Sequence, residues 1–283
     1  MDIKSLCDVP SWEWPRDAGK VILKTLTEKG ADQSDRLAAA ELAGDLVVMN
    51  DQLAGALLAI VRSGDEPEDL RATAAIALGA VLEQADTELV DTNGFEDPED
   101  VPISYSTFRN LQDSLRKLYF DETIAKEVRL RILEASVRAQ QDWHPSVIKT
   151  AYSSRDEDWM LTAVFSMGYV RGFNDQILEA LKSTNPEIHY EAVRAAGNWE
   201  LDAAWPHVVA LVNDPATPKP LLLAAIDAVA SIRPREAGPI LVDLADSDDE
   251  EIAEAADEAM GMARVMSSDP SDEEDEDEND WVN

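Results

Sequence analysis

Small residues recur at a regular interval along this chain, near the ends of segments that have the apolar spacing of a helix. They are Gly44, Gly79, Gly168, Gly197 and Gly261, with Val137 and Val229 in the equivalent place of two further copies. Apart from one long gap after Gly79, successive copies are about 29 to 35 residues apart. A unit of that length suits two helices of three to four turns joined by tight turns, since each helical residue adds about 1.5 Å.

Further small residues stand five and four positions before these anchors, at Ala39-Ala40, Ala74-Ala75, Ala163-Val164, Ala192-Val193 and Ala256-Asp257. Such side chains allow the first helix of one repeat to approach that of the next closely. Aromatic residues are only 6% of the chain, which favours helices over sheet. We therefore predict an all-α fold, a right-handed α-solenoid of about seven short helix-pair repeats.

Prolines fall where helices would begin, because proline is tolerated in the first turn and disruptive further on. Near the starts of first helices lie Pro67, Pro186 and Pro218, and near the starts of second helices lie Pro145, Pro206 and Pro239. If the usual handedness applies, the inner face is lined by second helices beginning near Asn50, Pro145, Asn174, Pro206 and Pro239.

The clearest repeat reads Asn185-Pro-Glu-Ile-His-Tyr-Glu-Ala-Val-Arg-Ala-Ala-Gly197. This pattern resembles the short HEAT-like repeats of phycobilin lyase subunits and of many bacterial scaffold proteins, over roughly Arg36 to Val265. The resemblance implies the fold, whereas function stays open because such solenoids include scaffolds, lyases and a few other enzymes.

Three segments depart from the repeat. Residues 1–30 contain Pro15, an apolar run at 21–23 and Gly30, and are predicted to cap the repeats of 31–266 with a helix of the second type. Residues 86–106 are acidic, contain Asn93-Gly94 and are predicted to form an insertion loop, which is either solvated, a contact for a cationic partner or a weak calcium site. Residues 267–283 are predicted to be a disordered acidic tail, serving as a short linear motif or for solubility.

The chain carries 58 acidic and 24 basic residues, a formal net charge of −34. A surface of this charge repels nucleic acid and anionic membranes and attracts a basic protein, although acidity also serves solubility or adaptation to salt. The lone Cys7 excludes an internal disulfide, the start lacks a secretory signal, and the longest apolar run, Leu53 to Val61, is too short to span a membrane. A cytoplasmic protein is expected.

Motifs of catalysis are missing from the sequence: it has no Gly-x-Ser-x-Gly, no phosphate-binding glycine loop and no paired cysteines. Of its three histidines, His144 and His207 adjoin prolines at helix starts, and His189 does not share a helix face with Glu191. The His-Glu dipeptides that mark the HEAT-like deoxyhypusine hydroxylases do not occur, and HEAT-like DNA glycosylases need a cationic surface. We predict no catalytic residue, cofactor or metal ligand, and no enzyme.

Tryptophans are the best candidates for partner binding, because this residue is enriched among binding hot spots. Trp143, Trp199 and Trp205 lie at or near turns within repeats, where they are either exposed anchors or staples folded over helix ends, and Trp159 takes a core position. The candidate partner-binding residues are Trp143, Trp199, Trp205, Asp97, Glu99, Asp100 and Trp281.

The favoured hypothesis is a non-enzymatic scaffold, adaptor or inhibitor that presents an acidic helical surface to a basic protein. One alternative is a HEAT-like chromophore lyase or other enzyme, which requires a buried polar pocket. The other is a structural module of a larger assembly, which would have an apolar end face.

Overall fold

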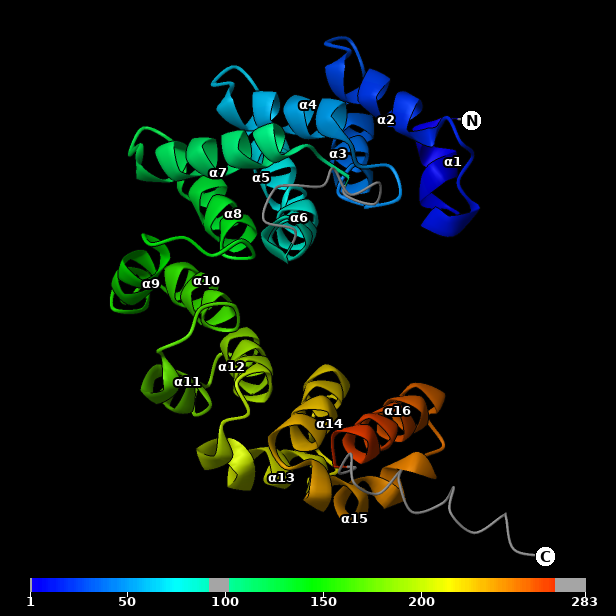
Figure 1. Ribbon diagram of the computed structural model, residues 1–283, viewed down its shortest axis with the longest axis vertical. Helices are drawn as coiled ribbons and strands as arrows, with labels where there is room; N and C mark the ends of the chain where they lie inside the picture. The colour runs from blue at the N-terminus through cyan, green and yellow to red at the C-terminus, as the bar shows by residue number, and fades with distance from the viewer. Residues whose placement is uncertain (1, 92–101, 268–283) are drawn as a thin grey trace, which may run out of the picture. The chain divides into compact units, whose positions relative to one another are not determined.

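The computed structural model describes residues 2–91 and 102–267 (Figure 1). Every regular element in these two ranges is a helix, and they contain no strand, so the predicted all-α fold is confirmed. Contacts between Cα atoms divide the chain into two compact units, Met1–Val147 and Ile148–Asn283, and each is described by itself.

The first unit is built from paired layers of short helices. In chain order these are α1 (Ile3–Cys7), the 3-10 turn η1 (Ser11–Glu13), α2 (Ala18–Thr27), α3 (Gln33–Leu42), α4 (Asp51–Arg62), α5 (Glu68–Ile76), α6 (Gly79–Asp91), α7 (Tyr105–Phe120), α8 (Lys126–Ser136) and α9 (His144–Tyr152), which ends in the second unit. The first helices α3, α5 and α8 pack against one another in succession, and α2, α4 and α7 form the second layer. This is the predicted stacking of helix pairs.

The predicted small residues lie where first helices meet. Ala39, Ala40, Ala74 and Ala75 are fully buried. A Cβ placed on Gly44 would lie 3.1 Å from the carbonyl oxygen of Ala77 and 3.2 Å from its Cα. The backbones of adjacent repeats therefore approach so closely that only small side chains fit between them.

Both departures from the repeat in this unit are partly helical. The expected cap of the second type is α2, and the short α1 packs against both α2 and α3. Helix α6 continues to Asp91 and α7 begins at Tyr105, so the first and last residues of the predicted loop 86–106 are helical. Residues 92–101 lie outside the described part. The acidic composition of 86–91 suggested a loop, but these residues extend a helix that already begins at Gly79.

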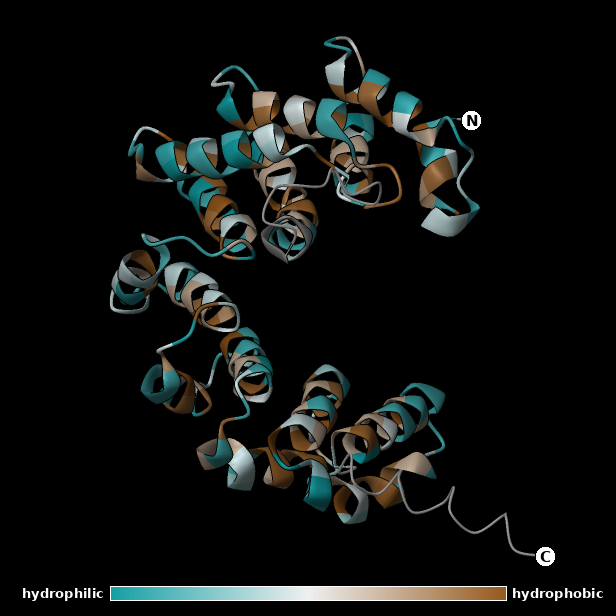
Figure 2. Ribbon diagram, in the orientation of Figure 1, coloured by the Kyte–Doolittle hydropathy of each residue, from teal (hydrophilic) through white to brown (hydrophobic). Residues whose placement is uncertain are grey.

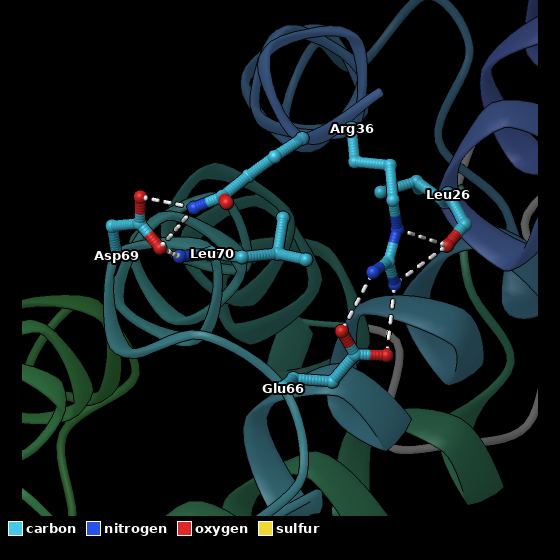
Figure 3. Close-up of polar contacts among 6 residues, drawn as sticks. Leu26, Arg36, Glu66, Asp69 and Leu70 are labelled. Carbon is cyan, nitrogen blue, oxygen red and sulfur yellow. Dashed lines mark hydrogen bonds and ion pairs between the residues drawn. The ribbon is translucent and has the colours of Figure 1, made fainter. Parts of the chain in front are cut away.

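An arginine at the fourth position of three first helices ties each one to the helix before it. Arg36 donates from Nε and Nη2 to the carbonyl of Leu26 at 3.3 and 3.1 Å, and Arg71 donates to Val61 at 3.1 and 3.0 Å. Arg129 Nε donates to the carbonyl of Tyr119 at 2.8 Å. Each acceptor is the penultimate residue of its helix, where a carbonyl has no partner within the helix. Figure 3 shows Arg36 between Leu26 and Glu66, which accepts from Nη1 at 2.6 Å and Nη2 at 2.9 Å.

The second unit continues the same pairing. Its helices are α10 (Glu157–Met167), α11 (Asn174–Ala180), α12 (Pro186–Asn198), the 3-10 turn η2 (Asp202–Ala204), α13 (Trp205–Asn213), α14 (Lys219–Ile232), α15 (Pro234–Ala245) and α16 (Glu250–Ser267). Most helices in both units alternate hydrophobic and hydrophilic residues along their length (Figure 2). The hydrophobic residues form the core between the layers, including Ile177, Ile188, Val208, Ile226 and Leu241.

Within the second unit the first helices α10, α12, α14 and α16 contact one another in succession, while α13 touches α15 more sparsely (Figure 1). The layer with the closer contacts lies on the inside of a curve, so the first helices form the inner layer of this unit. The prediction that second helices line the inner face is therefore wrong here. It rested on the usual handedness of such solenoids, whereas alanine and glycine on the first helices decide which layer packs closer.

One proline differs from its predicted role. Helix α15 begins with Pro234 at its first position, which leaves Pro239 inside the helix rather than at its start. The ring of Pro239 removes one backbone N–H near the amino end of the helix. The other predicted prolines lie in first turns or directly before them, as Pro186 and Pro206 do.

Candidate functional site

A groove with a volume of about 460 Å³ lies between α12 and α14 on the inner layer of the second unit. Its walls include Tyr190 and Asn198 from α12, and Leu223 and Ser231 from α14. At its floor a Cβ on Gly197 would stand 3.0 Å from Ala228 Cα, so the two helices meet backbone to backbone. The small residues that build the repeat thus also produce this groove.

The cations of the groove already have partners. Lys219 Nζ lies 2.7 and 2.9 Å from the carboxylate oxygens of Asp249 and 2.5 Å from Glu251 Oε2. Arg194 Nη1 lies 3.3 Å from Glu191 Oε2. Because both cations are neutralised locally, neither makes the groove positive.

One anion of the groove has no such partner. Asp227 stands in the middle of α14, and within the described residues its carboxylate makes no hydrogen bond or ion pair. Partial desolvation by α14 and its neighbours and then the negative charge of Glu258 raise the pKa of Asp227, while Arg194 lowers it, and the Asp227 side chain stays exposed to solvent. A carboxylate with a raised pKa is one that a nearby cation would stabilise.

Helix α16 adds an acidic stripe beside the groove. Glu251, Glu254 and Glu258 are all exposed, and their spacing of three and four residues places them on one face. Glu251 lines the groove and Glu258 acts on Asp227, so this face is the one turned toward α14. The groove is therefore negative, and it suits a cationic side chain.

Comparison with known proteins agrees with this architecture. Residues 174–261, which include α11 to α15, match the family model for HEAT repeats. This stretch of the chain contains HEAT repeats. No curated protein matches the chain. Among solved structures, human deoxyhypusine hydroxylase in complex with glycerol is similar to this chain with a TM-score of 0.41 and 15% sequence identity, over 93% of this chain and 88% of that one.

This likeness contradicts one prediction. We expected no enzyme because no catalytic motif is present, yet deoxyhypusine hydroxylase, one of the solved structures that are similar to the chain, is an enzyme, so this prediction is not upheld. The absence of known motifs does not by itself exclude catalysis, because one fold supports many functions and an active site can be assembled from side chains on separate helices.

Trp199 links two successive HEAT repeats. Its indole Nε1 donates to the carbonyl of Met167 at 2.6 Å, and the guanidinium of Arg171 lies 4.4 Å from its ring centroid. Asn198 Nδ2 donates to the next carbonyl, that of Gly168, at 3.3 Å. Trp199 is thus half-buried and covers the end of α10. Of the two alternatives for this residue, it is the staple and not the exposed anchor.

Trp143 and Trp205 are buried, with 5% and 9% of their surface exposed. Trp143 packs against Tyr119 and Phe120 at centroid distances of 5.2 and 5.5 Å. Of the two alternatives for these residues, burial excludes the exposed anchor and leaves the staple, because turns between short helices leave apolar helix ends that a large ring covers. Trp159, expected in the core, is only half-buried.

The remaining predicted residues, Asp97, Glu99, Asp100 and Trp281, lie outside the described residues, as does the predicted tail after Ser267.

The last helix, α16, exposes an apolar stripe made of Met262, Val265 and Met266, with exposed fractions of 50%, 76% and 48%. No helix in the described ranges is long and apolar enough to cross a bilayer.

His144 and Ser136 resemble a base and nucleophile but are arranged as a structural pair. His144 Nδ1 accepts from the backbone N–H of Gln141 at 2.9 Å, so the ring proton lies on Nε2, 3.1 Å from Ser136 Oγ. In this tautomer Nε2 donates to the hydroxyl and is unable to accept its proton. Burial lowers the pKa of His144 to about 4 and both side chains are buried, so we assign them no catalytic role.

His189 and His207 lie together, which the sequence analysis missed. Their Nε2 atoms are 2.7 Å apart, His189 on α12 and His207 on α13. Helix periodicity relates His189 only to neighbours on its own helix, and so it does not indicate a contact with His207. The groove was missed for a similar reason, although Asp227 alone within an apolar segment of α14 was a signal for it.

Proposed function

We propose that this chain is a helical-repeat scaffold that binds a basic protein through the groove between α12 and α14. The observation that carries the proposal is the place of Asp227, an exposed carboxylate that lines the groove on the inner layer and forms no ion pair or side-chain hydrogen bond within the described residues. The stripe of Glu251, Glu254 and Glu258 extends the negative surface beside it.

Charge complementarity supports a basic partner. A chain with a formal net charge of −34 attracts cationic proteins over a range set by ionic strength, and it repels nucleic acid and anionic membranes. A lysine or arginine entering the groove would pair with Asp227 where water is partly displaced. With a single cysteine in the chain, a reducing compartment such as the cytoplasm is the proposed location.

The test uses a fluorescent deca-lysine peptide and the intact chain, titrated at low and high salt. Asp227→Asn should weaken binding by about two- to five-fold, the effect of one partly screened ion pair. The matched control is Asp243→Asn, which removes the same charge from an exposed position on α15 in the other layer. Equal losses in both variants would show that only net charge matters and would contradict a site in the groove.

A second candidate, a structural module of a larger assembly, is favoured by the apolar stripe at Met262, Val265 and Met266. Sedimentation velocity of the intact chain over a range of concentrations tests it. An unchanged monomer throughout would speak against self-assembly through this stripe.

A further inference from the structure

The two histidines of the second unit bring their Nε2 atoms within hydrogen-bond distance of each other. His189 Nε2 and His207 Nε2 are 2.7 Å apart, and the two rings have centroids 5.0 Å apart and planes inclined by 63°. Both side chains are half-buried, and they come from the two helices of one repeat. The helix backbones therefore hold both imidazoles in place.

Neither imidazole is used as an anchor between repeats. His189 is the fourth residue of α12, the position at which Arg36, Arg71 and Arg129 bind the preceding helix in the first unit. Here the side chain turns to α13 instead, and within the described residues its only hydrogen-bond partner is His207. His189 therefore lacks the contact with the preceding helix that the arginines make at the same position of the helix.

A metal ion requires neutral imidazole, and burial favours that form in both rings. Burial lowers the pKa of both histidines, and the neighbouring His207 lowers that of His189 further. In the neutral pair one Nε2 carries a proton and donates it to the lone pair of the other. If that proton moves to Nδ1 of its own ring, both Nε2 lone pairs are free and no proton has to leave the protein.

We propose that His189 and His207 together bind a divalent late transition-metal ion such as Cu²⁺, Ni²⁺ or Zn²⁺ through their Nε2 atoms. Two nitrogens that each lie about 2.0 Å from one ion at a tetrahedral angle are about 3.3 Å apart, so the rings need to separate by about 0.6 Å. Imidazole is a good ligand for these ions, and affinity should be highest for Cu²⁺.

The site would be an open one. No group of three or more His, Cys, Asp or Glu residues suited to a metal is found among residues 2–91 and 102–267. Two histidines leave the other coordination positions to water or to an added ligand, as in sites that exchange ligands rather than closed structural sites. Hard ions such as Mg²⁺, which prefer oxygen, should not bind here.

The experiment adds one equivalent of Cu²⁺ to the intact chain without a histidine tag and records its electron paramagnetic resonance spectrum. Hyperfine splitting from two imidazole nitrogens is expected, and His207→Ala should reduce it to one or none. In calorimetric titrations with Zn²⁺, His189→Ala and His207→Ala should each weaken binding at least ten-fold. Mg²⁺ should produce no comparable saturable binding.

The control variant is Glu187→Gln, which removes an exposed carboxylate two residues from His189 and leaves both imidazoles. It should bind Cu²⁺ and Zn²⁺ like the unmodified chain. A spectrum of the unmodified chain without nitrogen splitting would overturn the proposal and assign the metal to acidic surface residues. Because that spectrum needs no substitution, it decides the question even if an alanine variant fails to fold.

Discussion

In the first unit, arginine side chains donate hydrogen bonds to backbone carbonyls at the ends of helices, and this contact recurs from repeat to repeat. The carbonyl of Leu26, like those of Val61 and Tyr119, lies at the end of a helix and lacks a partner within it, and an arginine from the next helix supplies one. Arg36 does more than Arg71, since it also binds Glu66 and lowers the pKa of that carboxyl by donating hydrogen bonds to it. Each arginine holds two successive helices together.

Replacing Arg36 by methionine should therefore destabilise the protein. The change leaves the Leu26 carbonyl and the Glu66 carboxylate without their donor, and the expected loss of unfolding free energy is about 1–3 kcal/mol. Urea denaturation measures it. The same substitution at the exposed Arg16, which has no partner among residues 2–91 and 102–267, should change stability by less than about 0.5 kcal/mol. An equal loss at both positions would refute the anchoring role.

His144 should make stability depend on pH. Its pKa is about 4 in the folded protein and near 6.5 when unfolded, so the unfolded state takes up a proton first as pH falls. Stability from this group is complete above pH 6.5 and falls by up to about 3 kcal/mol as the pH drops toward 4. His144→Gln should flatten this part of the curve of unfolding free energy against pH. A curve parallel to that of the unmodified protein would contradict the buried neutral form.

At the scale of helices, the distance between first helices depends on single glycines. A Cβ on Gly197 would lie 3.0 Å from Ala228 Cα and 3.2 Å from its Cβ, whereas one on Gly55, exposed in α4, has nothing within 4 Å. Gly261 also has open space, since no further helix of the described chain packs beyond α16. Glycines of the same repeat position therefore differ in what they contribute.

Gly197→Val should push α12 and α14 apart and lower the unfolding free energy by about 1–3 kcal/mol, the usual cost of an overpacked contact. Gly55→Val, the same change on an open helix surface, should be neutral or slightly stabilising because glycine is the poorer helix former. Thermal unfolding of both variants gives the comparison. A tolerated valine at Gly197 would mean that the close approach of these helices is not required.

The helix pairs were predictable because their signal is local and repeated. Alanine pairs such as Ala39-Ala40 and anchors such as Gly197 indicate a close helix contact wherever they occur, whatever the partner. The inner layer was not predictable in this way, since it depends on the relative spacing of two layers. Nor was the pair of His189 and His207, because residues eighteen apart on different helices meet only through the packing of both.

For the whole molecule, the predicted repeat architecture is confirmed, whereas the predicted binding residues stay a prediction. Of the two alternatives for the tryptophans, the structure shows the staple, since Trp199 covers the helix end at Met167. The proposed binding surface is formed by Asp227 and the exposed glutamates of α16. Only their position beside the groove distinguishes them from other acidic residues. In so acidic a sequence, composition gave no reason to single them out.

The central claim is that partner binding takes place on the first-helix layer of the second unit. Hydrogen–deuterium exchange of the intact chain, with and without a saturating lysine-rich peptide, tests it most directly. We expect slower exchange in α12, α14 and α16, with α11, α13 and α15 unchanged. Protection confined to the second helices, or spread evenly over the chain, would contradict the claim.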